Sequence, residues 1–303
     1  MSITTNQPKK TSLDKHHKQP RAVGGKYTDE NLVTLSPQEH MKHHGIWRER
    51  EAEFEELKML YDNYKSAQVC RMKASNQILA FQRGVDKLTP DTKKFLKEQI
   101  DRYEDYEIAL GKDIAKWIKK YGKTNPYVAS VMSVKFVGPV FAAGLLIYLD
   151  IEKAEHPSSF WKYVGIAGPS SERYTKNEAS GGNKTLRNAL YVWTGGLYKG
   201  QKIGSPYLDI ILREKDRLEH CEKLMSHRHN GKNYEVKWCD NDLPGMKGHR
   251  DMAARRKASK YFLADLWFVW RTLADLPTTD LYVKEHLGHE SAIIEPKTRG
   301  WVF

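Results

Sequence analysis

Two long stretches of this chain carry apolar residues at spacings of three and four, a periodicity that favours long helices packed side by side. Gly84 to Asp91 separates the stretches, and Thr89-Pro90 supplies an N-cap followed by proline at the first helical position. An antiparallel helical hairpin over residues 46–122 is the simplest structure. The apolar positions are Phe54, Leu57, Tyr61 and Tyr64 in the first stretch and Leu96, Ile100, Tyr103, Leu110, Ile114, Trp117 and Tyr121 in the second, where Glu107 interrupts the series.

The apolar seam of this hairpin leaves two alternatives open. It is buried only within the hairpin, or it also pairs with the hairpin of a second subunit and makes the protein a homodimer. A short polar segment rich in His, Gly and Pro precedes the hairpin, and a more apolar segment with glycine-marked turns follows it. We therefore expect a mainly α protein with three parts, at residues 1–45, 46–122 and 123–303.

The charge of the chain indicates the class of its partner. Fifty Lys and Arg oppose 38 Asp and Glu, which gives a net charge of +12. This excess favours a polyanion, with DNA as the first candidate and structured RNA as the second. The sequence has no apolar run of about 18 residues, no signal-peptide core and no disulfide framework. We expect no membrane partner and a cytoplasmic or nucleoid-associated location.

Histidines gather near the N-terminus beside two predicted strands. The first strand ends at His16 and His17, and Gly24-Gly25 permits a tight turn after it. Residues 32–35 form a second short strand. The motif therefore begins with two strands joined by a glycine-containing connection.

A helix is predicted directly after the second strand. Ser36 is a good N-cap, Pro37 fits the first helical position, and Glu39 completes a capping box. His40 and His44 are then one turn apart on the same face of this helix. Imidazoles that converge from a strand and a helix suit a divalent metal ion.

The residues from Leu13 to Gly25 and from Glu30 to His44 resemble the HNH nuclease family, which has a strand–strand–helix (ββα) metal fold. Many members also carry cysteine pairs that bind a structural zinc ion. Those cysteines are absent here, where Ser36 and Glu39 occupy the usual positions. The resemblance implies His16 as the first metal ligand, His17 as the general base, Asn31 as the residue that braces the loop and orients the base, and His40 as the second ligand, assisted by His44 or, as a weaker choice, His43.

This resemblance implies metal-dependent hydrolysis of a phosphodiester bond. His17 would take a proton from water, because the ordinary pKa of histidine is roughly 6.5. A metal ion on His16 and His40 would stabilise negative charge on the phosphate. Mg²⁺ or Mn²⁺ is expected, and an all-histidine site also accepts Zn²⁺ or Ni²⁺. Lys18 and Arg21 are candidate phosphate contacts, or else solvated surface charges.

The turn Val137-Gly138-Pro139 opens a predicted helix of small residues that reaches Tyr148. Such a turn exposes backbone N–H groups, which can bind a phosphate without reading bases. Val137 and Gly138 are therefore candidate DNA contacts. The alternative is a packing element that binds no ligand.

The order of the motifs after residue 128 resembles the C-terminal domain of the Piv-like recombinases, the bridge-RNA-guided insertion-sequence transposases. That domain has a helix-hairpin-helix-like core. The likeness covers roughly residues 128–290, but Phe136 replaces the first glycine of the hairpin, and the acidic RuvC-like domain of that family is missing. The motifs that carry it are Val134–Val140, Phe160–Pro169, Ser180–Leu190, Gly248–Arg250, Ala253–Arg256 and the aromatic helix Tyr261–Trp270.

The same resemblance implies a nucleophilic serine near a Ser-Gly pair, for which Ser180-Gly181 is the nearest match. A loop serine beside a phosphate is the alternative. Lys184, Arg187 and Lys199 are candidate contacts to the nucleic-acid backbone.

A second group of histidines and cysteines lies before the aromatic helix. Its spacing matches no paired-cysteine zinc pattern, so ordinary structural roles are favoured over a zinc site. The aromatic helix, apolar nearly all round, is expected in the core. The group consists of His220, Cys221, His227, His229 and Cys239.

These observations together predict an HNH-type DNA endonuclease, of phage or mobile-element type, that a helix-hairpin-helix-like domain targets to DNA. One alternative is a serine-type recombinase or transposase relative that uses Ser180 covalently. Another is a nucleic-acid-binding protein that carries the motif without catalysis.

Overall fold

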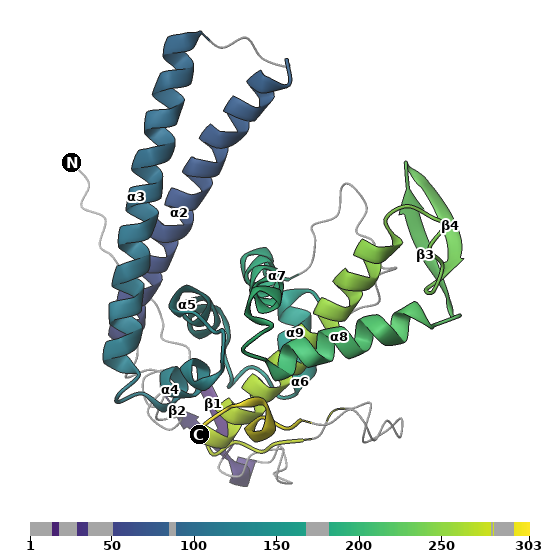
Figure 1. The fold of residues 1–303 in the computed structure, drawn as a ribbon. Helices are drawn as coiled ribbons and strands as arrows, with labels where there is room; N and C mark the ends of the chain where they lie inside the picture. Colours follow the sequence, from purple (N-terminus) through teal and green to yellow (C-terminus); the bar gives the residue numbers. More distant parts are fainter. Residues whose placement is uncertain are drawn as a thin grey trace, which may run out of the picture. The chain divides into compact units, whose positions relative to one another are not determined.

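The protein is mainly helical, as its sequence predicts (Figure 1). The chain separates into two compact units, residues 1–56 and 57–303, which we describe separately. The expected boundaries at residues 45 and 122 stay predictions. The structure, a computed structural model, describes residues 14–17, 29–35, 51–84, 89–167, 182–279, 281 and 294–303.

The first unit contains a pair of short strands. β1 (Asp14–His17) runs antiparallel to β2 (Leu32–Leu35), and the 3₁₀ helix η2 (Asp29–Asn31) leads directly into β2. Both predicted strands are confirmed. The helix predicted from Ser36 lies outside the described residues.

A long helical hairpin dominates the first part of the second unit. Helices α2 (Glu51–Gln82) and α3 (Pro90–Tyr121) run antiparallel, as Figure 1 shows. The predicted start of α3 is confirmed, because the Thr89 hydroxyl accepts a hydrogen bond from the Thr92 N–H at 3.2 Å. Glu107 of α3, which interrupts the apolar series, accepts hydrogen bonds from Gln68 at 3.0 Å and Arg71 at 2.8 Å of α2. This polar residue therefore cross-links the two helices.

Burial of the hairpin seam is uneven along its length. Leu57, Tyr61 and Ile114 are buried at the base of the hairpin, whereas Ile100 and Tyr103 nearer its tip are only half-buried. The Tyr61 side chain lies against Gly144 of the following helices, where an added Cβ would be 2.9 Å from the hydroxyl oxygen. The base of the hairpin thus packs into the core of the unit.

Local signals set the starts of most helices in this unit. Pro supplies no N–H group and fits the first turn, where that group has no intrahelical acceptor. Within the described residues, five helices begin at a proline. After the hairpin come α4 (Pro126–Ser133), α5 (Pro139–Tyr148), α6 (Pro157–Val164), α7 (Lys184–Leu197), the 3₁₀ helix η3 (Tyr198–Gly200), α8 (Pro206–Glu219) and α9 (Met246–Leu273).

The core forms around α9, which packs against α4, α6, α7 and α8. Phe262, Trp267 and Trp270 of α9 are fully buried, which confirms the prediction that the aromatic helix belongs to the core. The Phe262 ring contacts those of Trp193 and Trp301, at centroid distances of 4.4 and 5.4 Å. Aromatic residues from three segments therefore meet at one point of the core.

A strand pair that we did not predict lies between α8 and α9. β3 (Leu224–His229) and β4 (Lys232–Lys237) form an antiparallel hairpin. The two turn residues, Asn230 and Gly231, have φ of 48° and 80°. Asn-Gly is the preferred pair for a type I′ turn, which matches the twist of the flanking strands. The part after residue 123 is therefore not helical throughout.

The C-terminal segment returns to the helices. It contains the 3₁₀ helix η4 (Lys297–Arg299), after which Trp301 Nε1 donates to the Tyr207 hydroxyl at 2.7 Å. The Val302 N–H donates to the Ser133 hydroxyl at 3.0 Å. Of the helices that the structure describes, none has both the length and the apolar character to cross a bilayer.

Candidate nucleic-acid interface

The strand pair of the first unit joins two parts of the histidine motif. Its register places His17 opposite Leu32, and Leu32 directly follows Asn31, the last residue of η2. Opposite residues of antiparallel strands have Cα atoms about 4.5–5.5 Å apart. The backbones that carry the predicted general base and its predicted partner therefore lie at the same end of the strand pair.

The other predicted residues of this motif lie outside the described part of the chain. The backbones of His16, His17 and Asn31 are described, but their side chains lie outside the described part. Ser180, the candidate nucleophile, also lies outside it. The residues outside are Lys18, Arg21, His40, His43, His44 and Ser180.

The structure describes most of the second histidine and cysteine group. His227 is buried, and its Nε2 lies 3.2 Å from the carbonyl oxygen of Pro244. Its ring also contacts that of His249 on α9, with centroids 5.4 Å apart. The Cys239 N–H donates to the Cys221 carbonyl at 3.0 Å. These contacts attach the β3–β4 hairpin to the helices.

No metal site appears among these residues. Within the described ranges, no group of three or more His, Cys, Asp or Glu side chains is arranged to hold a metal ion. His220, the C-cap residue of α8, is exposed, and its Nδ1 lies 2.8 Å from the Asp216 carbonyl oxygen. The His229 side chain lies outside the described part. Structural roles account for the described members of the group.

The turn between α4 and α5 holds a bulky residue in a backbone conformation that glycine prefers. Phe136 has a φ of 67°, in the left-handed region, at the position where the resemblance expects glycine. Its ring packs directly on Gly200, where an added Cβ would clash with it. Gly138 is exposed and is the N-cap residue of α5, whereas Val137 is buried. The Val137 N–H donates to the Val134 carbonyl at 3.2 Å, so neither its buried side chain nor its N–H group is free for the predicted phosphate contact.

The start of α7 presents the other predicted backbone contacts. The Asn183 side chain caps the helix by accepting from the Leu186 N–H at 2.9 Å. Lys184 is exposed in the first turn, and Lys199 is exposed in η3. Arg187 is half-buried and donates to the Gly165 carbonyl at 3.4 Å. Both lysines are thus accessible, and Arg187 is partly committed to the fold.

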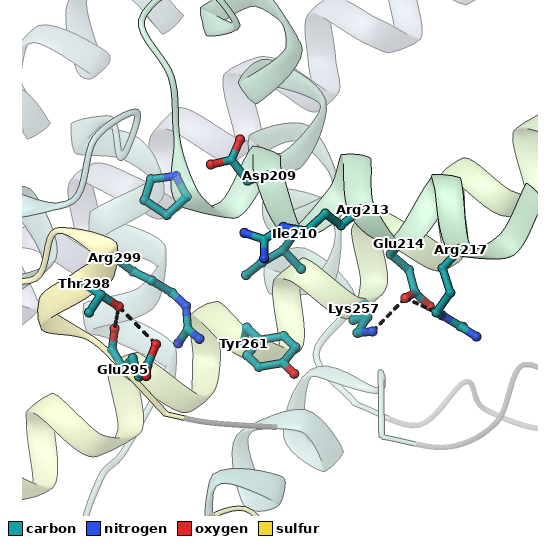
Figure 2. Close-up of a pocket in the computed structure, with 11 residues that line it drawn as sticks. Asp209, Ile210, Arg213, Glu214, Arg217, Lys257, Tyr261, Glu295, Thr298 and Arg299 are labelled. Atoms are coloured by element: carbon teal, nitrogen blue, oxygen red, sulfur yellow. Dashed lines mark hydrogen bonds and ion pairs between the residues drawn. The ribbon is translucent and has the colours of Figure 1, made fainter. Parts of the chain in front are cut away.

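A charged pocket of about 550 Å³ lies between α8, α9 and the C-terminal segment (Figure 2). Glu214 accepts hydrogen bonds from Arg217, at 2.7 and 2.9 Å, and from Lys257 at 2.7 Å. Burial raises the pKa of Glu214, but these hydrogen bonds outweigh it and keep the pKa below its ordinary value. Two of the cations in the pocket therefore share one carboxylate as their ion-pair partner. Arg213 is exposed and forms no ion pair within the described residues.

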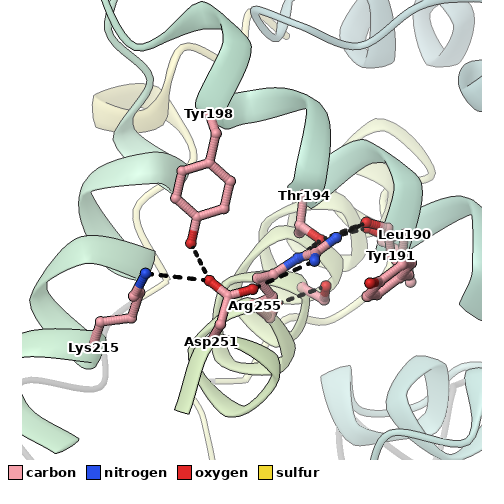
Figure 3. A network of polar contacts seen from close by, with 8 residues as sticks. Leu190, Tyr191, Thr194, Tyr198, Lys215, Asp251 and Arg255 are labelled. Atoms are coloured by element: carbon pink, nitrogen blue, oxygen red, sulfur yellow. Dashed lines mark hydrogen bonds and ion pairs between the residues drawn. The ribbon is translucent and has the colours of Figure 1, made fainter. Parts of the chain in front are cut away.

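A second polar network fixes α7, η3, α8 and α9 to one another (Figure 3). The Asp251 carboxylate accepts from the Tyr198 hydroxyl at 2.5 Å and lies 3.4 Å from Lys215 and 3.5 Å from Arg255. Arg255 also donates to the Thr194 hydroxyl at 3.1 Å. Burial, followed by the hydrogen bond to Asp251, raises the pKa of Tyr198. Arg255, one of the residues on which the predicted resemblance to the recombinases rests, is thus buried and structural.

Sequence reasoning did not identify a buried carboxylate in α9. Asp265 is fully buried and accepts hydrogen bonds from the Tyr207 hydroxyl at 2.7 Å and from Arg299 at 2.7 and 3.0 Å. The sequence signal that could have identified it is Asp265 itself, a single acidic residue within a run of apolar residues. Such a residue needs a partner, because an unpaired buried charge is costly.

Comparisons of the chain with protein-family models, with curated proteins and with solved structures give no match. The two resemblances therefore rest on the residues of this chain alone.

Proposed function

We propose that the protein is a metal-dependent DNA endonuclease of the HNH type, of phage or mobile-element type, and that its helical unit binds the DNA. The observation that carries the proposal is the register of β1 and β2. It places the backbone of His17 opposite Leu32, the residue that follows Asn31, and this supports the proposal that Asn31 orients His17. The net charge of +12 supports a nucleic-acid substrate.

The chemistry assigns one role to each residue of the motif. His17 removes a proton from a water molecule as the water oxygen attacks the phosphorus atom. The bond from phosphorus to the leaving oxygen breaks, and that oxygen takes a proton from solvent. Asn31 orients the His17 imidazole. The imidazoles of His16 and His40, with His44 assisting, would hold Mg²⁺ or Mn²⁺, which supplies positive charge to stabilise the phosphate oxygens.

The helical unit supplies affinity for the DNA backbone. The turn between α4 and α5 connects two helices in the manner of a helix-hairpin-helix element. Its exposed Gly138 precedes Pro139, so the first N–H groups of α5 are those of Val140 and Phe141. Two N–H groups at a helix start favour a phosphate oxygen. Lys184 and Lys199 extend the positive surface.

The decisive experiment measures cleavage of supercoiled plasmid and branched DNA with Mg²⁺, with Mn²⁺ and with EDTA. His17→Ala should lose cleavage and keep DNA binding. His156→Ala is the matched control, because His156 is exposed and its side chain makes no capping hydrogen bond to α6. Cleavage by His17→Ala at the wild-type rate would overturn the proposal. A covalent protein–DNA adduct that is lost in Ser180→Ala would instead identify a recombinase.

A further inference from the structure

A small pocket at the start of α8 combines positive charge with a buried hydroxyl group. It measures about 280 Å³ and lies between the end of α4, the start of α8 and the C-terminal segment. Lys135, Lys297 and Arg299 line it, and none of its described lining residues is acidic. This distinguishes it from the larger pocket of Figure 2, whose lining also contains the carboxylates of Asp209, Glu214 and Glu295. The described lining of the small pocket therefore carries net positive charge.

The hydroxyl of Ser205 is buried in this pocket without a hydrogen-bond partner. Ser205 is 3% exposed, and its Oγ makes no hydrogen bond in the structure. It occupies the N-cap position of α8, yet its side chain makes no capping hydrogen bond. A buried hydroxyl group without a partner destabilises the fold, so its retention points to a ligand that completes the hydrogen bond.

The other hydroxyl groups that line the pocket are already bonded within the described residues. Ser133 Oγ donates to the Ser130 carbonyl at 2.6 Å, and Thr298 Oγ1 donates to the Glu295 carbonyl at 2.9 Å. The Tyr207 hydroxyl donates to Asp265. Ser205 is thus the hydroxyl of the lining that is available to a ligand.

The start of α8 adds two N–H donors to the same place. Pro206 has no N–H group, and the first intrahelical hydrogen bond to Ser205 comes from Asp209 at 3.1 Å. The N–H groups of Tyr207 and Leu208 therefore have no acceptor inside the helix. Since α8 has 14 residues, its dipole also places partial positive charge at this end.

We infer that this pocket binds a phosphate group of the nucleic-acid backbone. The Ser205 hydroxyl and the first N–H groups of α8 donate hydrogen bonds to the phosphate oxygens. Lys135 and Lys297, both exposed, supply the opposing charge, and Arg299 is held at the rim by its ion pair with Asp265. The contact positions the backbone without reading bases. The inference rests on the proposed function for the source of the phosphate, because that function supplies the nucleic acid.

The variant Ser205→Ala tests whether the Ser205 hydroxyl contacts a ligand or only stabilises the start of α8. Binding to a DNA duplex is measured by fluorescence anisotropy in EDTA, so that no cleavage occurs. The variant should bind roughly tenfold to 150-fold more weakly, because one hydrogen bond to a charged group is lost. Its unfolding temperature without DNA should be equal to or higher than that of the wild type, since the hydroxyl has no protein partner and costs stability when buried. Equal affinity, or an affinity loss explained by unfolding, would overturn the inference.

Lys135→Ala and Lys297→Ala test the charge of the pocket. Each lysine that contacts a phosphate contributes about 1 to the slope of log affinity against log salt concentration, so each variant should lower that slope by about 1. Lys112→Ala is the matched control, because Lys112 is exposed on α3. Slopes equal to that of the control would overturn the inference.

Inorganic phosphate tests whether the pocket binds a phosphate group of the nucleic-acid backbone or free phosphate. If phosphate raises the unfolding temperature of the wild type more than that of Ser205→Ala, and DNA affinity also depends on Ser205, the inference holds. If Ser205 affects phosphate binding alone, the pocket takes free phosphate and the nucleic-acid assignment is wrong. All these measurements are independent of His17. A Ser205-dependent affinity without cleavage would therefore refute the endonuclease proposal and leave the phosphate pocket standing.

Discussion

The Arg299 guanidinium donates from Nη1 to both carboxylate oxygens of Asp265, at 2.7 and 3.0 Å. Asp265 is fully buried in α9, and Arg299 belongs to the C-terminal segment. The ion pair therefore attaches that segment to the core, next to the aromatic cluster and the proposed phosphate pocket.

Arg299→Ala should lower the free energy of unfolding by about 3–5 kcal/mol, because it leaves a buried carboxylate without its charge partner. Urea denaturation followed by circular dichroism measures the loss. Arg213→Ala is the control, since Arg213 is exposed on α8 and its removal should change stability by less than about 0.5 kcal/mol. Similar effects of the two variants would show that the ion pair does not hold the segment.

The stability of the protein should depend on pH through Asp265. Burial raises the pKa of Asp265 from 3.8 to about 6, although Arg299 and Tyr207 oppose the shift. The folded protein then binds this proton more tightly than the unfolded chain. The contribution of Asp265 to the free energy of unfolding is therefore full below about pH 4 and is lost as the pH rises from about 4 to 6.

Asp265→Asn removes that titration. Urea denaturation of both proteins at intervals between pH 3.5 and pH 7 should show a decline in the wild type that the variant lacks. Parallel curves for the two proteins would mean that Asp265 keeps an ordinary pKa in the folded state.

Two glycines close together in the chain should respond to alanine in opposite ways. Gly200→Ala forces a Cβ into the Phe136 ring and should destabilise the protein by about 1–3 kcal/mol. Gly196 lies in α7 with no atom within 4 Å of an added Cβ, so Gly196→Ala should stabilise it by about 0.5–1 kcal/mol. Thermal unfolding of both variants checks the prediction. Equal effects would show that Phe136 does not pack on Gly200.

The hairpin should make the protein a homodimer. On α2, Val69 is 47% exposed and Met72 is 53% exposed, and they lie about one turn apart on one face. A second subunit would cover these side chains and the half-buried seam near the hairpin tip. Sedimentation velocity should give a dimer for the wild type and a monomer for Val69→Glu/Met72→Glu.

Gln77→Glu serves as the control for this prediction. Gln77 is exposed on another face of α2, so the added charge should leave the dimer intact. A monomeric wild type, or a dimer that survives the double substitution, would place the seam within a single hairpin.

Signals between near neighbours in the chain predicted much of the fold. Thr89-Pro90 marked the start of α3, and the Gly24-Gly25 turn separated two predicted strands that the structure contains. The same kind of signal is present at Asn230-Gly231, a pair that favours the type I′ turn between β3 and β4. Each of these signals acts within a few residues, because caps and turns are satisfied locally.

The contacts that join distant segments could not be predicted in this way. Asp265 and Arg299 meet only because α9 and the C-terminal segment pack together, and Arg255 was marked by a motif but serves as a buried link. The small pocket that contains Ser205 is lined by residues from three segments. The sequence marks only the start of α8 within it, through Ser205-Pro206. Periodicity and capping therefore determine where helices form, whereas the partner of a buried charge or hydroxyl depends on which surfaces pack, and packing is decided by the burial of the whole apolar core.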